Sequence, residues 1–283
     1  NKMNKSLGGT SAMLGKIGNL AASAFAVSSI VKFGKESTTL GSDLEEVANV
    51  VNSTYTTLSS TVDEYAKKSI QRLGMSETTY KSMMGTLGAM SKSFGFTEEQ
   101  SLKMSDSITA LSADVASFYN LSTEEAYNKL KGVWTGESEG LKSLGVVMTQ
   151  SALDQFSLAE GFGKTTKEMS EQEKVALRYK FVLKQLETAS GDFQRTSDGF
   201  ANQSKILKEQ WLAFQTSIGQ GLLNFATPII KVLNILMSKL VTLGNLFSSF
   251  TSKLFGKAEA ATTSVASGIS DNLSGLADAA STT

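Results

Sequence analysis

YKSMMGTLGAMSKSFGFTEEQSLKMSDSITALSADVASF (Tyr80–Phe118) is the stretch that decides the fold class of this chain. Its apolar residues recur every three or four positions in two stripes, which are Tyr80, Met83, Leu87, Met90 and Phe94, and then Met104, Ile108, Leu111, Val115 and Phe118. This spacing places each stripe on one face of an α-helix. Gly95 stands where the first stripe stops, and Thr97 with Gln100 fits a capping box before the second. The stretch therefore predicts two amphipathic helices joined by a short turn.

The same periodicity runs through the rest of the chain and predicts an all-α protein. Capping boxes are expected at Ser122 with Glu125 and at Ser170 with Glu173, and Thr227 before Pro228 fits a further helix start. Pro228 is the one proline, which agrees with long helices. We expect long amphipathic helices and helical hairpins, elongated and oligomeric, with negligible β-structure. Their expected ranges are about 12–33, 36–56, 60–73, 77–94, 97–119, 123–134, 137–144, 150–160, 171–190, 196–224 and 228–250.

The residue types exclude much of enzyme chemistry. His and Cys are absent, so zinc sites built from them and His-based triads are excluded. No spacing pairs two of the carboxylates that could hydrolyse a substrate, which are Glu137, Glu139, Asp154 and Glu160. GFGKTT (161–166) resembles the end of a phosphate-binding loop, but Leu158 stands where that motif requires its first glycine. We expect no enzyme activity, no cofactor and no metal site.

Charge is balanced overall but unevenly distributed. Residues 1–35 and residues 211–257 contain lysines and no acid, and both segments are strongly apolar. This combination is typical of helices that face a membrane or a partner. We expect an apolar basic helix (1–35), a helical core region (36–210), apolar basic helices that are membrane-active or oligomerising (211–256), and a flexible or weakly helical tail (257–283). The chain begins with Asn, and we expect it to be a piece or a processed form of a longer protein.

Two patterns in the C-terminal third indicate contact surfaces. The first is a self-association seam with heptad-like spacing, interrupted at Ser204 and ended at Gly221, which consists of Phe200, Leu207, Trp211, Phe214 and Ile218. A hairpin packed within one chain would use the same seam. The second pattern is a narrow polar stripe on an apolar helix, which consists of Lys231, Asn234, Ser238, Thr242, Asn245 and Ser249. That helix is either core-buried or oligomer-facing, or it enters a bilayer with the stripe facing a lumen. The candidate residues of this second surface are Ile229, Ile230, Lys231, Leu233, Asn234, Leu236, Ser238, Leu240 and Thr242.

Three blocks of the sequence resemble the core region of phage tail tape-measure proteins. They are KFGKESTTLGSDLEEVANVV (Lys32–Val51), STEEAYNKLKGVWTGESEGLKSLGVVMT (Ser122–Thr149) and GDFQRTSDGFANQ (Gly191–Gln203). With the apolar helices that follow, the resemblance covers roughly residues 30–240. It implies a helical protein in the lumen or tip of a phage or bacteriocin-like tail, with three or six copies that set tail length. It also implies contact with tail-tube and tail-tip or baseplate proteins, and with the host membrane when the genome is ejected.

Two other functions fit parts of the sequence. A pore-forming or translocator-type helical toxin would share the apolar basic segments. A secreted helical-hairpin protein would share the WxG tripeptide Trp134–Gly136, although we expect Trp134 to be a core residue at a helix end. The lysines are not clustered with aromatic residues, so we expect no specific nucleic-acid binding.

Overall fold

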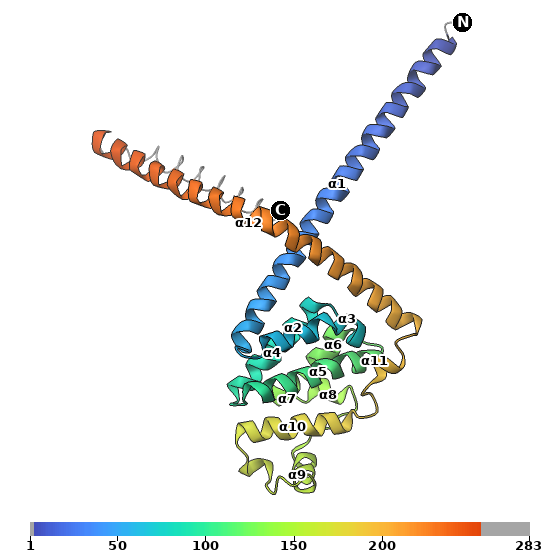
Figure 1. Ribbon diagram of the computed structural model, residues 1–283, viewed down its shortest axis with the longest axis vertical. Coiled ribbons are helices and arrows are strands. Elements are labelled where there is room, and N and C mark those ends of the chain that lie inside the picture. Colours follow the sequence, from blue (N-terminus) through green and yellow to red (C-terminus); the bar gives the residue numbers. More distant parts are fainter. Residues whose placement is uncertain (1–2, 256–283) are drawn as a thin grey trace. The chain divides into compact units, whose positions relative to one another are not determined.

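The computed structural model describes the backbone of residues 3–255 and the side chains of residues 29–250, and this part of the chain contains helices and no strand (Figure 1). The all-α prediction is confirmed. The predicted tail, 257–283, lies outside the described residues. The elements are α1 (Met3–Thr54), α2 (Ser59–Lys67), α3 (Ser69–Leu73), α4 (Glu77–Ser93), α5 (Glu98–Phe118), α6 (Thr123–Leu130), α7 (Gly132–Thr135), α8 (Glu139–Lys142), α9 (Gln150–Ala159), the 3-10 helix η1 (Thr166–Glu168), α10 (Glu171–Gln185), α11 (Asp192–Arg195) and α12 (Phe200–Phe255).

The chain separates into two compact units, and the first, Asp43–Phe214, holds the hydrophobic core. Helix α5 is its central element, because α4, α6, α11 and α3 all pack against it. The two stripes predicted from the sequence meet between α4 and α5, which run side by side in Figure 1. Tyr80, Leu87, Ile108 and Val115 are fully buried there. Apolar burial of this kind is the main favourable term in folding.

Local capping signals position the helices of this unit. The capping box of Thr97 and Gln100 is formed in both directions, with N···O distances of 3.2 and 3.0 Å. The box of Ser170 with Glu173 is likewise complete at the start of α10. At Ser122 only half of the predicted box is present, because its hydroxyl accepts the Glu125 N–H and no return bond accompanies it.

Small residues bring α1 and α4 into close contact. A Cβ on Gly88 would overlap the hydroxyl of Tyr55, which is fully buried and donates to the Met84 carbonyl at 3.0 Å. At Gly85 an added Cβ would lie 2.8 Å from Cγ1 of Val50, a half-exposed side chain. The aromatic side chain of Tyr55 thus occupies the space that an ordinary residue at position 88 would fill.

Both long helices differ from the sequence prediction. The helices expected at 12–33 and 36–56 form one helix, α1, which continues through Gly34. Within it, the Thr38 hydroxyl donates to the Gly34 carbonyl at 2.8 Å. The helices expected at 196–224 and 228–250 also form one helix, α12. The predicted helix start at Thr227 is wrong, since Pro228 lies inside α12, where its missing N–H removes one rung of the hydrogen-bond ladder. Conversely, the range 60–73 breaks at Lys68 and the range 123–134 breaks at Lys131.

The second unit consists of the described residues before Asp43 and after Phe214. Within it, α1 and α12 approach so closely that a Cβ on Gly219 would overlap the main-chain carbonyl of Ser37. A Cβ on Gly41 would lie 2.7 Å from the main chain of α12 at Gln220. Ser37 and both glycines are buried at this point. Small side chains permit such contact between helix backbones.

The glycine contacts predict a graded response to alanine in α4. Gly88→Ala should lower the free energy of unfolding by about 1–3 kcal/mol, because the buried Tyr55 ring must move. Gly85→Ala should cost less than about 1 kcal/mol, because Val50 can rotate toward solvent and alanine favours the helix. Urea unfolding monitored by circular dichroism measures both. Equal losses at the two positions would contradict the proposed contact with Tyr55.

Candidate functional site: the apolar face of α12 and its anchor

The predicted seam lies on α12 and is exposed. Phe200 is 90% exposed and Leu207 is 68% exposed, and the other three seam residues, Trp211, Phe214 and Ile218, are also open to solvent. The rings of Trp211 and Phe214 pack on each other with centroids 5.6 Å apart. The seam is therefore a surface of this chain, and the five side chains share one helix face, as their spacing predicts.

The apolar stripe also continues beyond the predicted seam. Because α12 is unbroken through Gly221 and Pro228, residues further along the helix extend the same face. After Ile218 the stripe proceeds in steps of three and four, through Leu222, Phe225, Ile229, Val232, Leu236, Leu240, Leu243, Phe247 and Phe250, all of them exposed. The end of the seam predicted at Gly221 is thus wrong. The pattern repeats every 18 residues, from Phe200 to Ile218 to Leu236, which corresponds to five full turns of an α-helix.

The second set of predicted site residues lies on the same helix, and all nine side chains are exposed. Of these, Ile229, Leu236 and Leu240 belong to the apolar stripe, whereas Lys231, Asn234, Ser238 and Thr242 lie on the opposite face. The alternative of a core-buried helix is therefore wrong for this chain by itself. It follows that α12 presents an apolar face and a narrower polar face along most of its length.

Several hydroxyls of the polar stripe are already bonded within the helix. Ser238 donates to the Ile235 carbonyl and Thr242 to the Ser238 carbonyl, each at 2.8 Å. Ser249 donates to the Asn245 carbonyl at the same distance. Such bonds to the preceding turn satisfy a hydroxyl without water. Burial of these hydroxyls therefore costs less free energy than their polarity indicates. Burial of the side-chain amides of Asn234 and Asn245 would cost more.

Among the described residues, one helical stretch is long and apolar enough to cross a membrane, namely Phe200–Phe250, and its most apolar window is entirely unburied. This assignment rests on the length and the composition of the helix alone. A bilayer and a second apolar helix are both compatible with such a surface.

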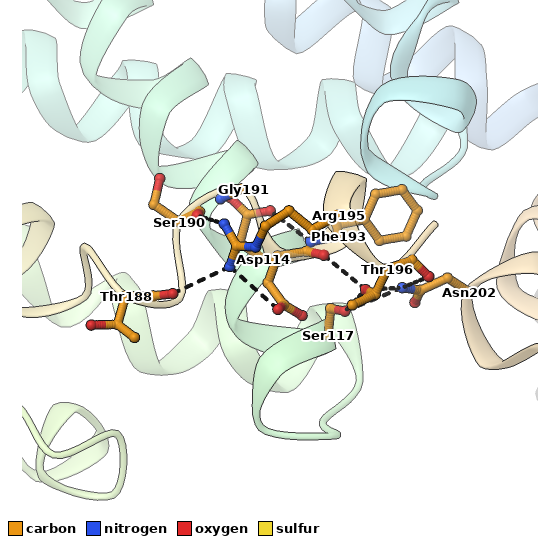
Figure 2. A network of polar contacts seen from close by, with 10 residues as sticks. Asp114, Ser117, Thr188, Ser190, Gly191, Phe193, Arg195, Thr196 and Asn202 are labelled. Atoms are coloured by element: carbon orange, nitrogen blue, oxygen red, sulfur yellow. Dashed lines mark hydrogen bonds and ion pairs between the residues drawn. The ribbon is translucent and has the colours of Figure 1, made fainter. Parts of the chain in front are cut away.

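An anchor in the Asp43–Phe214 unit holds the segment that leads into α12 (Figure 2). Asp114 on α5 accepts hydrogen bonds from the main-chain N–H groups of Gly191 at 2.7 Å and Phe193 at 3.1 Å. Gly191 adopts a left-handed conformation with φ 76°, which turns both N–H groups toward the carboxylate. The ring of Phe193 packs against Gly74, where an added Cβ would lie 2.5 Å from the ring.

The electrostatic environment of Asp114 has opposing contributions. Burial is the largest and raises the pKa of this carboxyl, while the bonds from Gly191 and Phe193 lower it. Asp192 raises the pKa further and Arg195 lowers it, with a net increase. In Figure 2 the Arg195 guanidinium lies beside this group, where it donates to the Ser190 carbonyl at 2.6 Å.

Two further contacts attach the first turns of α12. The buried amide of Asn202 donates to the hydroxyls of Thr196 at 2.8 Å and Ser117 at 3.2 Å. Glu209 accepts the main-chain N–H of Ser76, the N-cap residue of α4, at 2.9 Å. These residues were not among those predicted from the sequence. For Asp114 the sequence did contain a signal. This residue stands next to Val115 of the apolar stripe, and a carboxylate on a buried helix requires hydrogen-bond donors.

The other candidates from the sequence have structural roles. Trp134 is fully buried, and its indole N–H donates to the Ser91 hydroxyl at 2.8 Å, which confirms it as a core residue. Asp154 accepts the Thr166 N–H at 2.6 Å. Lys164 of the glycine-flanked turn pairs with Glu173 at 2.6 Å. Within the described part of the chain, no three acidic side chains group as a metal site.

No protein-family model matches this chain, and neither a curated protein nor a solved structure matches it. The resemblance to tape-measure proteins therefore stays a prediction.

The anchor predicts a pH-dependent difference between the protein and its Asp114→Asn variant. The folded-state pKa of Asp114 is raised, so the folded state holds this proton more tightly than the unfolded state. The stability that the protonated Asp114 carboxyl contributes is therefore complete at pH values below its unfolded-state pKa. This contribution is lost as the pH rises through its folded-state pKa. The unfolding free energy of the wild type minus that of the variant should therefore fall as the pH rises from below the ordinary pKa of an aspartate through the raised folded-state pKa of Asp114.

Urea unfolding at several pH values measures this difference. Subtracting the variant from the wild type removes the opposite pH dependence that other carboxylates contribute to both proteins. A difference that rises with pH would contradict the assignment. Asp114→Ala serves as a comparison at each pH, because it leaves the N–H groups of Gly191 and Phe193 without their acceptor and should cost about 2–4 kcal/mol.

Proposed function

We propose that this chain is a structural tape-measure protein of a phage or phage-like tail. In this proposal it lies in the lumen or tip of the tail tube, contributes to tail length and assists genome ejection across the host membrane. Its partners are copies of itself, three or six in number, together with tail-tube and tail-tip or baseplate proteins and the host membrane. It acts without catalysis, cofactor or specific nucleic-acid binding.

The observation that carries the proposal is the continuous exposed apolar stripe of α12. A helix of 56 residues, at 1.5 Å per residue, is about 84 Å long. An apolar face of that length demands a partner, because exposed apolar area of this extent is unfavourable in water. Copies of a tape-measure protein that lie along a tube supply such a partner. The three blocks that resemble tape-measure proteins lie on α1, on α6 to α8, and on α11 with the start of α12, and the resemblance supports the same proposal.

The period of the stripe bears on how copies would pack. A heptad pattern of 3.5 residues per turn drives helices into a left-handed supercoil, and an 11-residue pattern drives a right-handed one. The 18-residue repeat of α12 corresponds to 3.6 residues per turn, close to that of a straight helix. Copies of α12 would therefore lie nearly straight and parallel to the tube axis.

A pore-forming or translocator-type toxin is the second candidate, and the membrane-length stretch of α12 favours it. It would use the same apolar surface without any tail. The secreted WxG-type alternative has less support, because Trp134 is a buried core residue bonded to Ser91.

The ruler role predicts a change in tail length. Deletion of Leu233–Phe250, 18 residues, removes five turns and keeps the stripe in register, so tails should shorten by about 27 Å. Duplication of the same segment should lengthen them by about 27 Å. Averaged negative-stain images of the parent particle measure both. Unchanged lengths in the two variants would sink the ruler role of α12, and leakage of dye-loaded liposomes by the chain alone would then favour the toxin.

The stripe predicts face-specific self-association. Leu236→Glu places a charge in the apolar stripe and should weaken association at least about tenfold, because an unpaired charge is costly to bury. Ser238→Glu, two residues away on the polar face, should leave association within about twofold. Sedimentation velocity over a concentration series measures both. A monomeric wild type would contradict the proposal, and equal effects of the two variants would show that the stripe is not the interface.

A further inference from the structure

A basic cavity in the Asp43–Phe214 unit is lined by residues of α9, η1 and α10, none of which belongs to the anchor. Its volume is about 330 Å³, which falls within the range of small-molecule sites. Three cations line it, Lys167, Lys174 and Arg178, together with Thr166 and the apolar side chains of Leu153 and Leu177. No carboxylate lines this cavity. By contrast, the acidic side chains Glu124, Glu125 and Glu137 line a second cavity in this unit, with a volume of about 480 Å³.

The walls of the basic cavity are fixed by local bonds. Asp154 on α9 accepts the main-chain N–H of Thr166 at 2.6 Å and so fixes the start of η1. A capping box between Thr165 and Glu168 closes that turn, with an N···O distance of 2.8 Å. Lys167 is thereby carried on a bonded turn, while Lys174 and Arg178 are four residues apart on one face of α10. The three cations therefore come together from two ordered elements.

Arg178 is held in place without a hydrogen-bonded carboxylate. Its Nε donates to the Val133 carbonyl at 2.7 Å and its Nη2 to the Trp134 carbonyl at 3.1 Å. These two bonds orient the guanidinium and use two of its five N–H groups. Burial lowers the pKa of Arg178, and Glu171 offsets this only in part. An anion that accepts hydrogen bonds from the remaining N–H groups would therefore stabilise the charged form of this partly buried guanidinium.

The two lysines add charge that is only partly neutralised. Lys174 pairs with Glu171 at 2.7 Å, but that carboxylate is 67% exposed and lies outside the cavity lining. Lys167 makes no direct ion pair among the residues whose side chains the structure describes, but its charge interacts with the nearby carboxylate of Asp154. The cavity thus concentrates positive charge beside two leucine side chains.

We propose that this cavity binds a small phosphomonoester, with the phosphate group held by Lys167, Lys174 and Arg178 and the carbon chain against Leu153 and Leu177. Phosphate oxygens accept charge-assisted hydrogen bonds from ammonium and guanidinium groups, and three such side chains line this cavity. The site does not depend on the proposed tail function.

Equilibrium dialysis of the full chain with radiolabelled inorganic phosphate and with radiolabelled glycerol 3-phosphate tests this site, at constant ionic strength set with chloride. Lys174→Gln and Lys167→Gln should each raise the Kd for glycerol 3-phosphate at least about tenfold, because each removes a charge-assisted donor. Glycerol 3-phosphate should bind more tightly than inorganic phosphate, because its carbon chain contacts the leucines.

Lys184→Gln is the matched control. Lys184 also lies on α10 and pairs with a neighbouring acid, Glu187, at 3.1 Å, but it does not line the cavity. It should leave the Kd within about twofold. Equal weakening by Lys184→Gln would show that general surface charge is responsible and would overturn the proposal, as would absence of binding to the wild type. Tighter binding of inorganic phosphate than of glycerol 3-phosphate would overturn the assignment to an ester.

Discussion

The interaction on which the C-terminal third of the molecule depends is the pair of hydrogen bonds that Asp114 accepts from Gly191 and Phe193. Between α10 and α12 the only regular element is the four-residue α11, which cannot satisfy its own first N–H groups. The carboxylate on α5 provides acceptors from 77 residues away in the sequence. Without it, the segment that positions the start of α12 would lose two hydrogen bonds to the central helix of the core, and the bond from Asn202 to Ser117 would remain.

The described residues place apolar side chains in two opposite environments. In the Asp43–Phe214 unit, apolar side chains are buried to the point that Gly88 leaves room only for the Tyr55 ring. Along α12, by contrast, apolar side chains of the same types remain in solvent. The first arrangement is that of a folded core, and the second is that of half an interface. Assembly would therefore stabilise α12 far more than it would stabilise the core, which is already complete within one chain.

The sequence predicted the elements whose signals are local. The stripes of α4 and α5, two capping boxes and the burial of Trp134 could be predicted, because each depends on residues three or four apart or on the size of one side chain. The helix ends expected near Gly34 and Thr227 were wrong, because a single unfavourable residue does not outweigh the turns on either side. The anchor and the basic cavity depend on long-range contacts, such as Arg178 with Val133 or Asp114 with Gly191, and no local pattern records these.

Pro228 gives α12 one mechanically weak point. Every other residue in the middle of this helix can donate to the preceding turn, but the proline cannot, so the carbonyl of Asn224 lacks its usual donor. A long helix bends most readily where such a rung is missing. Under compression or around a corner, α12 would therefore flex at Pro228 and remain stiff elsewhere, in the manner of two rods joined by a hinge. The stripe on each rod would keep its own register, so packing in one half could persist while the other half reorients.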